Sequence, residues 1–232
     1  MENRKTSEKR VVLTKVDSVQ LTYLLPSPHV EGTVSVEEAL THRRSHRSYL
    51  KDAISAEDLS QILWAAYGIT RPSSVYIQTR GDLRTAPSAG AMYPLELYVL
   101  IGKVTDIESG VYKYIPKGHK IIRTINREIR RELSTAALNQ EMISTAPACL
   151  FYSAVFSRNT QRYGTRGREK YVCMDLGHSA QNVYLQAEAL NLGTCAIGAF
   201  NDMAVKEVMQ LPEEEEPLLI MPVGKYNVGS EF

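Results

Sequence analysis

The sequence has few cysteines, almost no net charge and no long apolar run. Its three cysteines, Cys149, Cys173 and Cys195, are odd in number and widely spaced. This excludes a disulfide framework and a zinc motif and favours buried thiols in a reducing compartment. The net charge of +1 argues against nucleic acid or a membrane surface as a partner, because such proteins usually carry a larger basic excess. No stretch of about 18 apolar residues is present, so no membrane-spanning helix is expected.

Motifs for nucleotide binding, hydrolysis and metal binding are also missing. There is no Gly-x-Gly-x-x-Gly and no Walker loop, so no separate dinucleotide-binding domain is predicted. Residues 177–181, Gly-His-Ser-Ala-Gln, lack the final glycine of the Gly-x-Ser-x-Gly pattern that forms a nucleophile elbow in hydrolases. His178 is therefore expected to be a packed helix residue and not a catalytic one. His42 and His46 have the spacing of a metal site, but the neighbouring arginines repel a divalent cation. No metal is therefore predicted.

The length of the chain indicates one large domain. With 232 residues, of which 44% are hydrophobic, it can bury a substantial core. Residues 1–33 have little periodic apolar surface and are predicted to form an N-terminal arm, whereas residues 34–232 are predicted to form a single domain. The polar residues 1–10 contain no apolar signal-peptide core, so a cytoplasmic location is expected.

Local patterns predict the secondary structure. A capping-box pattern at Ser35 indicates a helix that runs to about Arg43, and the segment from Ser55 to Asp58 opens a second helix that stops at Gly68. Helices and strands do not alternate regularly, and hairpins occur, which indicates the α+β class. The other expected elements are a strand at 95–101, a hairpin of 110–115 and 120–124, a helix at 127–142, a strand at 148–156, a long core helix at 169–192, a short helix from Asn201 or Asp202 to Met209, a strand at 218–223, and solvated loops at 71–84 and 213–216.

Two segments carry the candidate site. In residues 84–101, a loop of small residues leads into an apolar strand. Its residues 87–91 carry no bulky side chain, so a flat ligand can approach their backbone closely. In residues 43–47, three arginines and a serine follow a helix. Arginine presents a planar fork of donors that binds phosphate oxygens bidentately, so this second segment suits a phosphate.

Together these segments resemble the FMN-dependent nitroreductase family, and most closely its SagB-type or azoline oxidase branch, which acts in thiazole and oxazole formation. The resemblance covers residues 25–226 and also draws on Val34–Tyr49, Arg162–Phe200 and Met221–Lys225. It implies a nitroreductase-like α+β fold with a central mixed, mainly antiparallel sheet flanked by helices. It further implies a homodimer with FMN at the interface, and NAD(P)H as a transient electron donor.

The resemblance assigns the phosphate side of the flavin to basic residues. Arg43, Arg44 and Ser45 are implied to contact the phosphate and the ribityl chain. Arg47 is implied to face the pyrimidine side of the ring, where a positive charge stabilises the reduced flavin. Gly224-Lys225 ends the last expected strand, and its lysine would add a further positive charge at the phosphate.

Two backbone segments are implied to face the flavin ring. The N–H near Gly198 or Ala199 is implied to point at flavin N5, where a fixed donor helps to set the electron affinity of the ring. Ala91 stands where related nitroreductases often have asparagine, which fits the azoline oxidase branch better. The ring-facing residues are Pro87, Ser88, Ala89, Gly90 and Met92 in the first segment, and Ile197, Gly198 and Ala199 in the second.

The activity implied by the resemblance is a ping-pong oxidoreduction, in which NAD(P)H reduces FMN and a nitroaromatic, quinone or flavin acceptor takes the electrons. One alternative is an azoline oxidase-like dehydrogenase that acts on heterocyclised peptides. There Arg162 and Tyr163 match a lysine-tyrosine pair that removes a proton. Arginine stays protonated and cannot be a base, whereas tyrosine can relay a proton. A second alternative is a flavin-binding subunit without turnover.

Overall fold

The computed structural model describes residues 12–13, 20–72 and 82–227. A large sheet contains β1 (Val12–Leu13), β2 (Thr22–Leu24), β5 (Leu95–Ile101), β6 (Gly110–Ile115), β7 (Lys120–Ile125), β8 (Ala148–Ala154), β9 (Gly193–Thr194) and β10 (Glu216–Gly224). Their order is β1-β2-β7-β6-β5-β8-β10-β9, and each ladder between these neighbours is antiparallel. Part of the predicted arm thus joins the sheet as β2, which pairs with β7.

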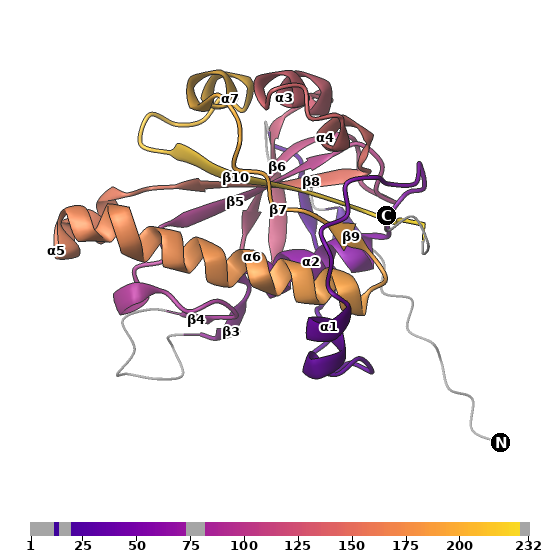
Figure 1. Ribbon diagram of the computed structural model, residues 1–232, viewed down its shortest axis with the longest axis horizontal. Coiled ribbons are helices and arrows are strands. Elements are labelled where there is room, and N and C mark those ends of the chain that lie inside the picture. Colours follow the sequence, from indigo (N-terminus) through magenta and orange to yellow (C-terminus); the bar gives the residue numbers. More distant parts are fainter. Residues whose placement is uncertain (1–11, 14–19, 73–81, 228–232) are drawn as a thin grey trace.

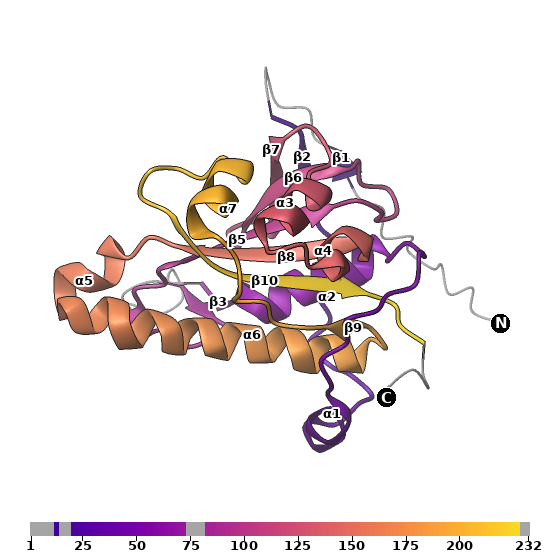
Figure 2. The ribbon, with the colours of Figure 1, turned by 45° about the horizontal axis from the view of Figure 1, so that its top comes forward.

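Helices cover both faces of this sheet. The helices are α1 (Val36–His42), α2 (Ala56–Tyr67), α3 (Arg130–Ala136), α4 (Glu141–Thr145), α5 (Ser157–Tyr163), α6 (Val172–Ala189) and α7 (Asp202–Val208). Figures 1 and 2 show α6 running along one face with α2 beside it, while α3, α4 and α7 cover the other face. The predicted α+β fold, a mainly antiparallel sheet flanked by helices, is confirmed. None of the described helices has the length and hydropathy needed to cross a bilayer.

The central strand β8 explains why the sheet has two hydrophobic cores. Every residue of β8 is buried. Leu150 and Tyr152 point into the core beneath α2 and α6, whereas Cys149 and Phe151 point into the core beneath α3, α4 and α7. Successive side chains of a strand face opposite sides, so a strand covered on both sides is apolar throughout.

The predicted helix starts at Ser35 and Ser55 are confirmed. The Ser35 Oγ accepts a hydrogen bond from the Glu38 N–H at 3.0 Å, and the Ser55 Oγ accepts one from the Asp58 N–H at 2.9 Å. Each bond satisfies a backbone donor that has no partner inside the helix. The strands and the hairpin predicted at 95–101, 110–124, 148–156 and 218–223 also match β5, β6, β7, β8 and β10.

The single helix predicted at 127–142 is wrong. The chain instead forms α3 and α4, because Leu138 and Asn139 both adopt a left-handed backbone with φ of 59°. Such a conformation cannot continue a right-handed helix. The predicted loop at 71–84 also needs correction at its ends, since β3 (Ile69–Arg71) pairs with β4 (Leu83–Arg84); residues 73–81 lie outside the described residues.

The long helix at 169–192 was expected to lie in the core, but only one side of it does. A π-helical turn, Gly167–Tyr171, precedes α6. On α6, Cys173, Met174, Gly177, His178 and Gln181 are exposed; we call these residues the open face of α6. The prediction that the cysteines are buried is therefore wrong for Cys173, which is exposed. The prediction that His178 is packed is also wrong, because its side chain is exposed.

The acidic run 213–216 was predicted to be a solvated loop, but Glu215 is only 2% exposed. Its carboxylate accepts hydrogen bonds from the Tyr98 and Ser153 hydroxyls, and it pairs with the Lys113 ammonium at 2.8 Å. Lys113 also pairs with Glu96 at 3.1 Å. Glu215 therefore fixes the start of β10 to three other strands of the sheet.

His119 links the N-terminal region to the sheet and to α2. The Ser60 Oγ donates to the Pro26 carbonyl at 2.6 Å, so it can only accept from Nε2–H of His119, 2.7 Å away. The Nδ1 of a neutral His119 then accepts from the Tyr114 hydroxyl at 2.9 Å. Burial lowers the pKa of His119 below its ordinary value of 6.5, against the opposing effect of the Pro26 carbonyl.

We expect the free energy of unfolding to fall as the pH drops below about 6.5, because the unfolded chain protonates His119 before the folded chain does. Thermal unfolding at pH 7.5 and pH 5.5 measures this loss. In His119→Gln the difference between the two pH values should shrink, while the exposed His178→Gln should keep the full difference. Equal pH dependence in all three proteins would refute this role of His119.

Candidate functional site

The predicted phosphate segment leaves α1 and lies against the edge of the sheet. The Arg43 N–H still donates to the Ala39 carbonyl, but its ψ of 122° ends the helix. Ser45 then forms an isolated parallel β-bridge with Thr194, and the His46 N–H donates to the Thr194 carbonyl at 3.0 Å. The segment 43–47 is thereby held beside β9.

Tyr184 of α6 connects this segment to the loop after β9. Its hydroxyl lies 3.1 Å from the Ser45 Oγ and accepts from the Ala196 N–H at 2.8 Å. The Arg43 guanidinium lies over its ring, 5.2 Å from the centroid. Sequence analysis missed Tyr184, and its only signal was an aromatic residue with a polar tip on the long helix.

The end of β10 brings a further cation to the same place. The Leu50 N–H donates to the Lys225 carbonyl at 2.8 Å, so Lys225 lies beside the chain that follows the arginines. Gly224 permits this close packing, because a Cβ there would be 2.5 Å from Pro147 Cδ. Arg44, Arg47 and Lys225 are exposed, and Arg43 is half-buried. The structure thus gathers the four predicted cations at one end of the β9–β10 edge.

The predicted N5 segment continues along this edge. The Ile197 N–H donates to the Ile220 carbonyl at 2.9 Å, and the Ala199 carbonyl accepts from the Gln140 side chain at 2.8 Å. Gly198 and Ala199 are exposed, and a Cβ at Gly198 would meet nothing within 4 Å. Among the described residues, no acceptor binds the N–H of Gly198 or Ala199. Two backbone donors therefore remain available on a fixed edge.

The loop 87–92 is held by Asp175 of α6. The Ser88 hydroxyl donates to Asp175 Oδ2 at 2.6 Å, and the Ala89 N–H donates to Oδ1 at 3.2 Å. Burial raises the pKa of Asp175 against the lowering effect of these two bonds. Asp175 therefore occupies the Ala89 N–H, and the assignment of Ala89 to the flavin ring stays a prediction. Pro87 and Gly90 are exposed and Met92 is half-buried.

Tyr163 lies against the same loop. A Cβ added at Gly90, where φ is 63°, would collide with the Tyr163 hydroxyl. The Tyr163 ring packs edge-on against Tyr171 at 4.9 Å, and the exposed Arg162 guanidinium lies 5.3 Å from the Tyr163 centroid. The structure therefore brings the predicted Arg162 and Tyr163 to the loop 87–92.

Within one chain, the two parts of the predicted site lie on opposite flanks of α6. Asp175 holds the loop 87–92, and Tyr184 holds the cationic segment. These residues are nine positions apart, which is about two and a half turns and about 13.5 Å along the helix axis. They therefore point in opposite directions, with the open face of α6 between them. One chain does not bring the two half-sites together.

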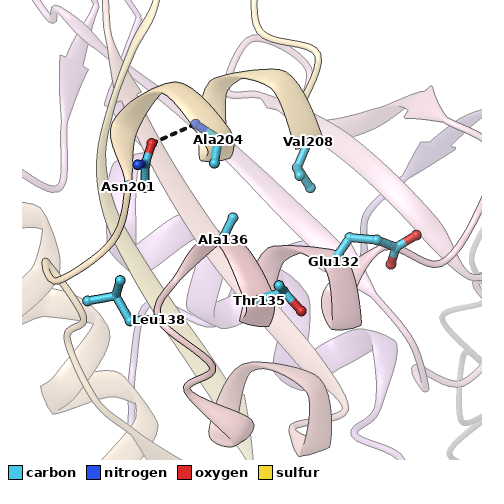
Figure 3. Close-up of a pocket in the computed structure, with 7 residues that line it drawn as sticks. All are labelled: Glu132, Thr135, Ala136, Leu138, Asn201, Ala204 and Val208. Carbon is cyan, nitrogen blue, oxygen red and sulfur yellow. Dashed lines mark hydrogen bonds between the residues drawn. The ribbon is translucent and has the colours of Figure 1, made fainter.

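A separate pocket of about 520 Å³ lies between α3 and α7 (Figure 3). Its lining is mainly apolar, and Asn201 is tied up at the start of α7, where its Oδ1 accepts from the Ala204 N–H at 2.9 Å. None of the predicted site residues lines it. The lining residues are Glu132, Thr135, Ala136, Leu138, Asn201, Ala204 and Val208. We assign no cofactor contact to this pocket.

Comparison with known proteins agrees with the sequence resemblance. A model of the nitroreductase family matches residues 40–225. A protein of Methanocaldococcus jannaschii, whose name places it among the nitroreductases, is 46% identical over 198 residues, which cover 85% of this chain and 94% of the relative. A solved structure from Ralstonia eutropha JMP134, also described as a nitroreductase, is 26% identical with a TM-score of 0.75, and the match covers 96% of each chain.

A further relative is named for the processing of trifolitoxin. The trifolitoxin-processing protein TfxB of Rhizobium leguminosarum bv. trifolii is 25% identical over 193 residues, which cover 81% of this chain. The chain spans about half the length of this relative, since the match covers 51% of TfxB.

Proposed function

The chain belongs to the nitroreductase family, a family of oxidoreductases, and we propose that it is an FMN-dependent enzyme that uses NAD(P)H to reduce nitroaromatic, quinone or flavin acceptors by a ping-pong mechanism. The observation that carries this proposal is the β9–β10 edge, where exposed cations adjoin two available backbone N–H groups, Gly198 and Ala199. FMN, when bound, supplies the hydride-accepting and electron-donating chemistry.

The cationic end of the edge suits a phosphate and a ribityl chain. Arg43, Arg44 and Lys225 offer charge-assisted donors to phosphate oxygens, and the Ser45 hydroxyl offers a neutral partner for the ribityl hydroxyls. Tyr184 keeps Ser45 in place. Arg47 extends the positive charge toward the edge, where it stabilises negative charge on a reduced ring.

The available N–H groups suit the ring. Gly198 and Ala199 lie on an edge whose position is fixed by the Ile197–Ile220 pair and by the Gln140–Ala199 bond. A donor held in place before the ligand arrives needs no reorganisation during the reaction. A Cβ at Gly198 would meet no atom of the described residues within 4 Å, which leaves room for a flat ring at this donor. The fixed, available N–H groups of Gly198 and Ala199 support a hydrogen bond from one of them to the hydride-accepting nitrogen of the flavin.

We further propose that the active unit is a homodimer with one flavin at each interface. The loop 87–92 and the cationic segment lie on opposite flanks of α6 in one chain, about 13.5 Å apart along the helix. A second copy that packs on the open face of α6 can bring its loop to the cationic segment of the first. Met174, which is 54% exposed on this face, then becomes buried.

The dimer proposal predicts a specific sensitivity at Met174. Met174→Glu should convert the dimer to a monomer and release the flavin, because it places an unpaired carboxylate in an apolar interface. Met203→Glu is the matched control, since Met203 is 79% exposed on α7, away from the open face. Sedimentation and the absorbance of retained flavin measure both effects. A flavin-loaded Met174→Glu dimer, or a monomeric parent protein, would exclude this interface.

The proposed activity is tested by steady-state kinetics with FMN-saturated protein. We expect oxidation of NADH or NADPH that depends on an added acceptor, with parallel lines in double-reciprocal plots, as ping-pong kinetics require. If none of the nitroaromatics, quinones and flavins supports oxidation of NADH or NADPH, the proposal is ruled out.

A second candidate is a dehydrogenase that acts on azoline rings in a modified peptide. The similarity to TfxB favours it, together with the position of Tyr163 against the loop 87–92. Tyr163 can relay the proton that leaves with the hydride, whereas the neighbouring Arg162 cannot act as a base. Turnover of a heterocyclised peptide, lost in Tyr163→Phe, would select this candidate over the first.

A further inference from the structure

The loop 87–92 and the residue that follows it have an unusual backbone. Gly90, Ala91 and Tyr93 all adopt a positive φ, of 63°, 55° and 46°. Only glycine adopts this left-handed conformation without a steric cost, because the Cβ of any other residue comes too close to a carbonyl oxygen. A positive φ is especially rare for a residue as bulky as tyrosine. Such a backbone persists only where the surrounding structure holds it, and it is concentrated at ligand sites.

Asp175 of α6 supplies the contacts that hold this backbone. Its Oδ2 accepts from the Ser88 hydroxyl at 2.6 Å, and its Oδ1 accepts from the Ala89 N–H at 3.2 Å. The Ser88 Oγ accepts in turn from the Tyr93 N–H at 2.9 Å. Asp175 therefore fixes both ends of the strained turn, the first directly and the second through Ser88.

The hydrogen bonds of Asp175 are those of an ionised carboxylate. Both of its oxygens accept, and the Ser88 hydroxyl has no other acceptor among the described residues for its proton. Asp175 is only 2% exposed, and none of the ion pairs between described residues includes it. A buried charge without an ion pair is costly, so the hold on the loop offsets a real cost in stability.

The same contacts determine which backbone donor the loop leaves available. Asp175 and the Ser88 Oγ occupy the first and last N–H groups of the stretch 89–93, and those of Ala91 and Met92 donate to carbonyls within the turn. The N–H of Gly90 alone in this stretch has no acceptor among the described residues. Gly90 is also exposed. The held loop therefore offers one backbone donor, at a glycine.

We propose that Asp175 is a positioning residue of the flavin site, which holds the loop 87–92 in the strained conformation that offers the Gly90 N–H to the ring. The inference rests on the proposed function, because it takes the loop as part of the flavin site. A donor fixed before the ligand arrives needs no reorganisation when the ligand binds. Without Asp175, Ala91 and Tyr93 relax toward negative φ and the donor loses its fixed position. Asp175 thus acts on the flavin through the loop and does not touch it.

Amide hydrogen exchange of the purified protein tests the hold on the loop. In Asp175→Ala, the amides of Ala89 and Tyr93 should exchange at least about tenfold faster, because the first loses its acceptor and the second loses the anchored Ser88. In Ser88→Ala, the Tyr93 amide should exchange faster while the Ala89 amide keeps its parental rate, since Asp175 still accepts from it.

Ser179→Ala is the matched control, because it removes a buried hydrogen-bonding side chain from the same helix. The Ser179 hydroxyl bonds to the Tyr152 hydroxyl and to the Ala66 carbonyl, and not to the loop. This variant should therefore unfold at a lower temperature but keep the parental exchange rates of both loop amides.

Titration of the apoproteins with FMN tests the link between the loop and the site. Asp175→Ala should bind FMN at least about tenfold more weakly than the parent protein, whereas Ser179→Ala should bind it equally well. Asp175→Asn should recover the affinity to within about threefold of the parent value, because its amide oxygen can accept from the Ala89 N–H and its amide nitrogen can donate to the Ser88 Oγ.

Parental exchange of both loop amides in Asp175→Ala would overturn the proposal, and so would parental FMN affinity in that variant despite faster exchange. If Asp175→Ala does not fold, an unchanged rate for the Tyr93 amide in Ser88→Ala overturns it as well. A parent protein that binds no FMN would refute the proposed function, and with it the role of Asp175 at the flavin, while the exchange rates would still show whether Asp175 holds the loop.

Discussion

The double variant Arg44→Gln/Lys225→Gln is expected to bind FMN at least about 100-fold more weakly than the parent protein. Both side chains are exposed beside the segment 43–47 and carry charge-assisted donors. A hydrogen bond to a charged group contributes about 1.5–3 kcal/mol, so the loss of two costs about 3 kcal/mol or more. Quenching of flavin fluorescence during titration into the apoprotein measures the dissociation constant.

The matched control is Lys117→Gln/Arg131→Gln, which removes the same charge from exposed positions elsewhere. This control should bind FMN like the parent protein at physiological salt. Arg44 also donates to the carbonyls of Thr41 and Arg43, so the melting temperature of each apoprotein should be measured alongside. Equal loss of affinity in both double variants would show that only net charge matters and would refute the phosphate site.

Glu215→Ala is expected to lower the free energy of unfolding by about 3 kcal/mol, because the buried hydroxyls of Tyr98 and Ser153 lose their acceptor and Lys113 keeps only Glu96 as a partner. Lys113, Tyr98 and Ser153 would all lose the carboxylate that now accepts their hydrogen bonds. For a chain of this length, the melting temperature should fall by about 6–12 °C. Differential scanning calorimetry measures the shift.

The neighbouring Glu214 provides the control for this prediction. It has the same side chain but is exposed, so Glu214→Ala should leave the melting temperature within about 1–2 °C of the parent value. If the two variants unfold at the same temperature, the buried network around Glu215 does not stabilise the fold as described.

Local signals were sufficient to predict much of the fold. Ser35 and Ser55 start helices because their hydroxyls accept the N–H of the residue three positions later, and this chemistry lies within four residues. The apolar run 95–101 indicates a buried strand for a similar reason, since burial on both faces removes polar residues. Predictions of this kind do not require knowledge of distant parts of the chain.

Other features depend on contacts between distant residues and were not predictable. Glu215 lies in a run of four glutamates, and only the arrival of Lys113 and Tyr98 from other strands distinguishes it from Glu214. The left-handed backbone at Leu138 and Asn139 splits one expected helix into two. Neither residue is a glycine, and Asn139 is a weaker signal of such a helix end than a glycine would be.

In the candidate site, too, local segments were predictable, whereas the contacts that join them were not. The segments 43–47 and 195–199 are recognisable separately, but Thr194 and Tyr184 join them across about 140 residues of sequence. Within one chain, Asp175 holds the loop 87–92 on the opposite flank of α6. The open face of α6 has apolar residues because, in our proposal, a second copy covers them, which a single chain cannot reveal.

The most direct test of the proposed function is the visible spectrum of the purified protein, recorded without oxygen before and after addition of NADH or NADPH. We predict flavin absorbance that bleaches with at least one nucleotide and returns when a nitroaromatic or quinone is added. A colourless protein that cannot be reconstituted with FMN, or flavin absorbance that neither nucleotide bleaches, would contradict the account.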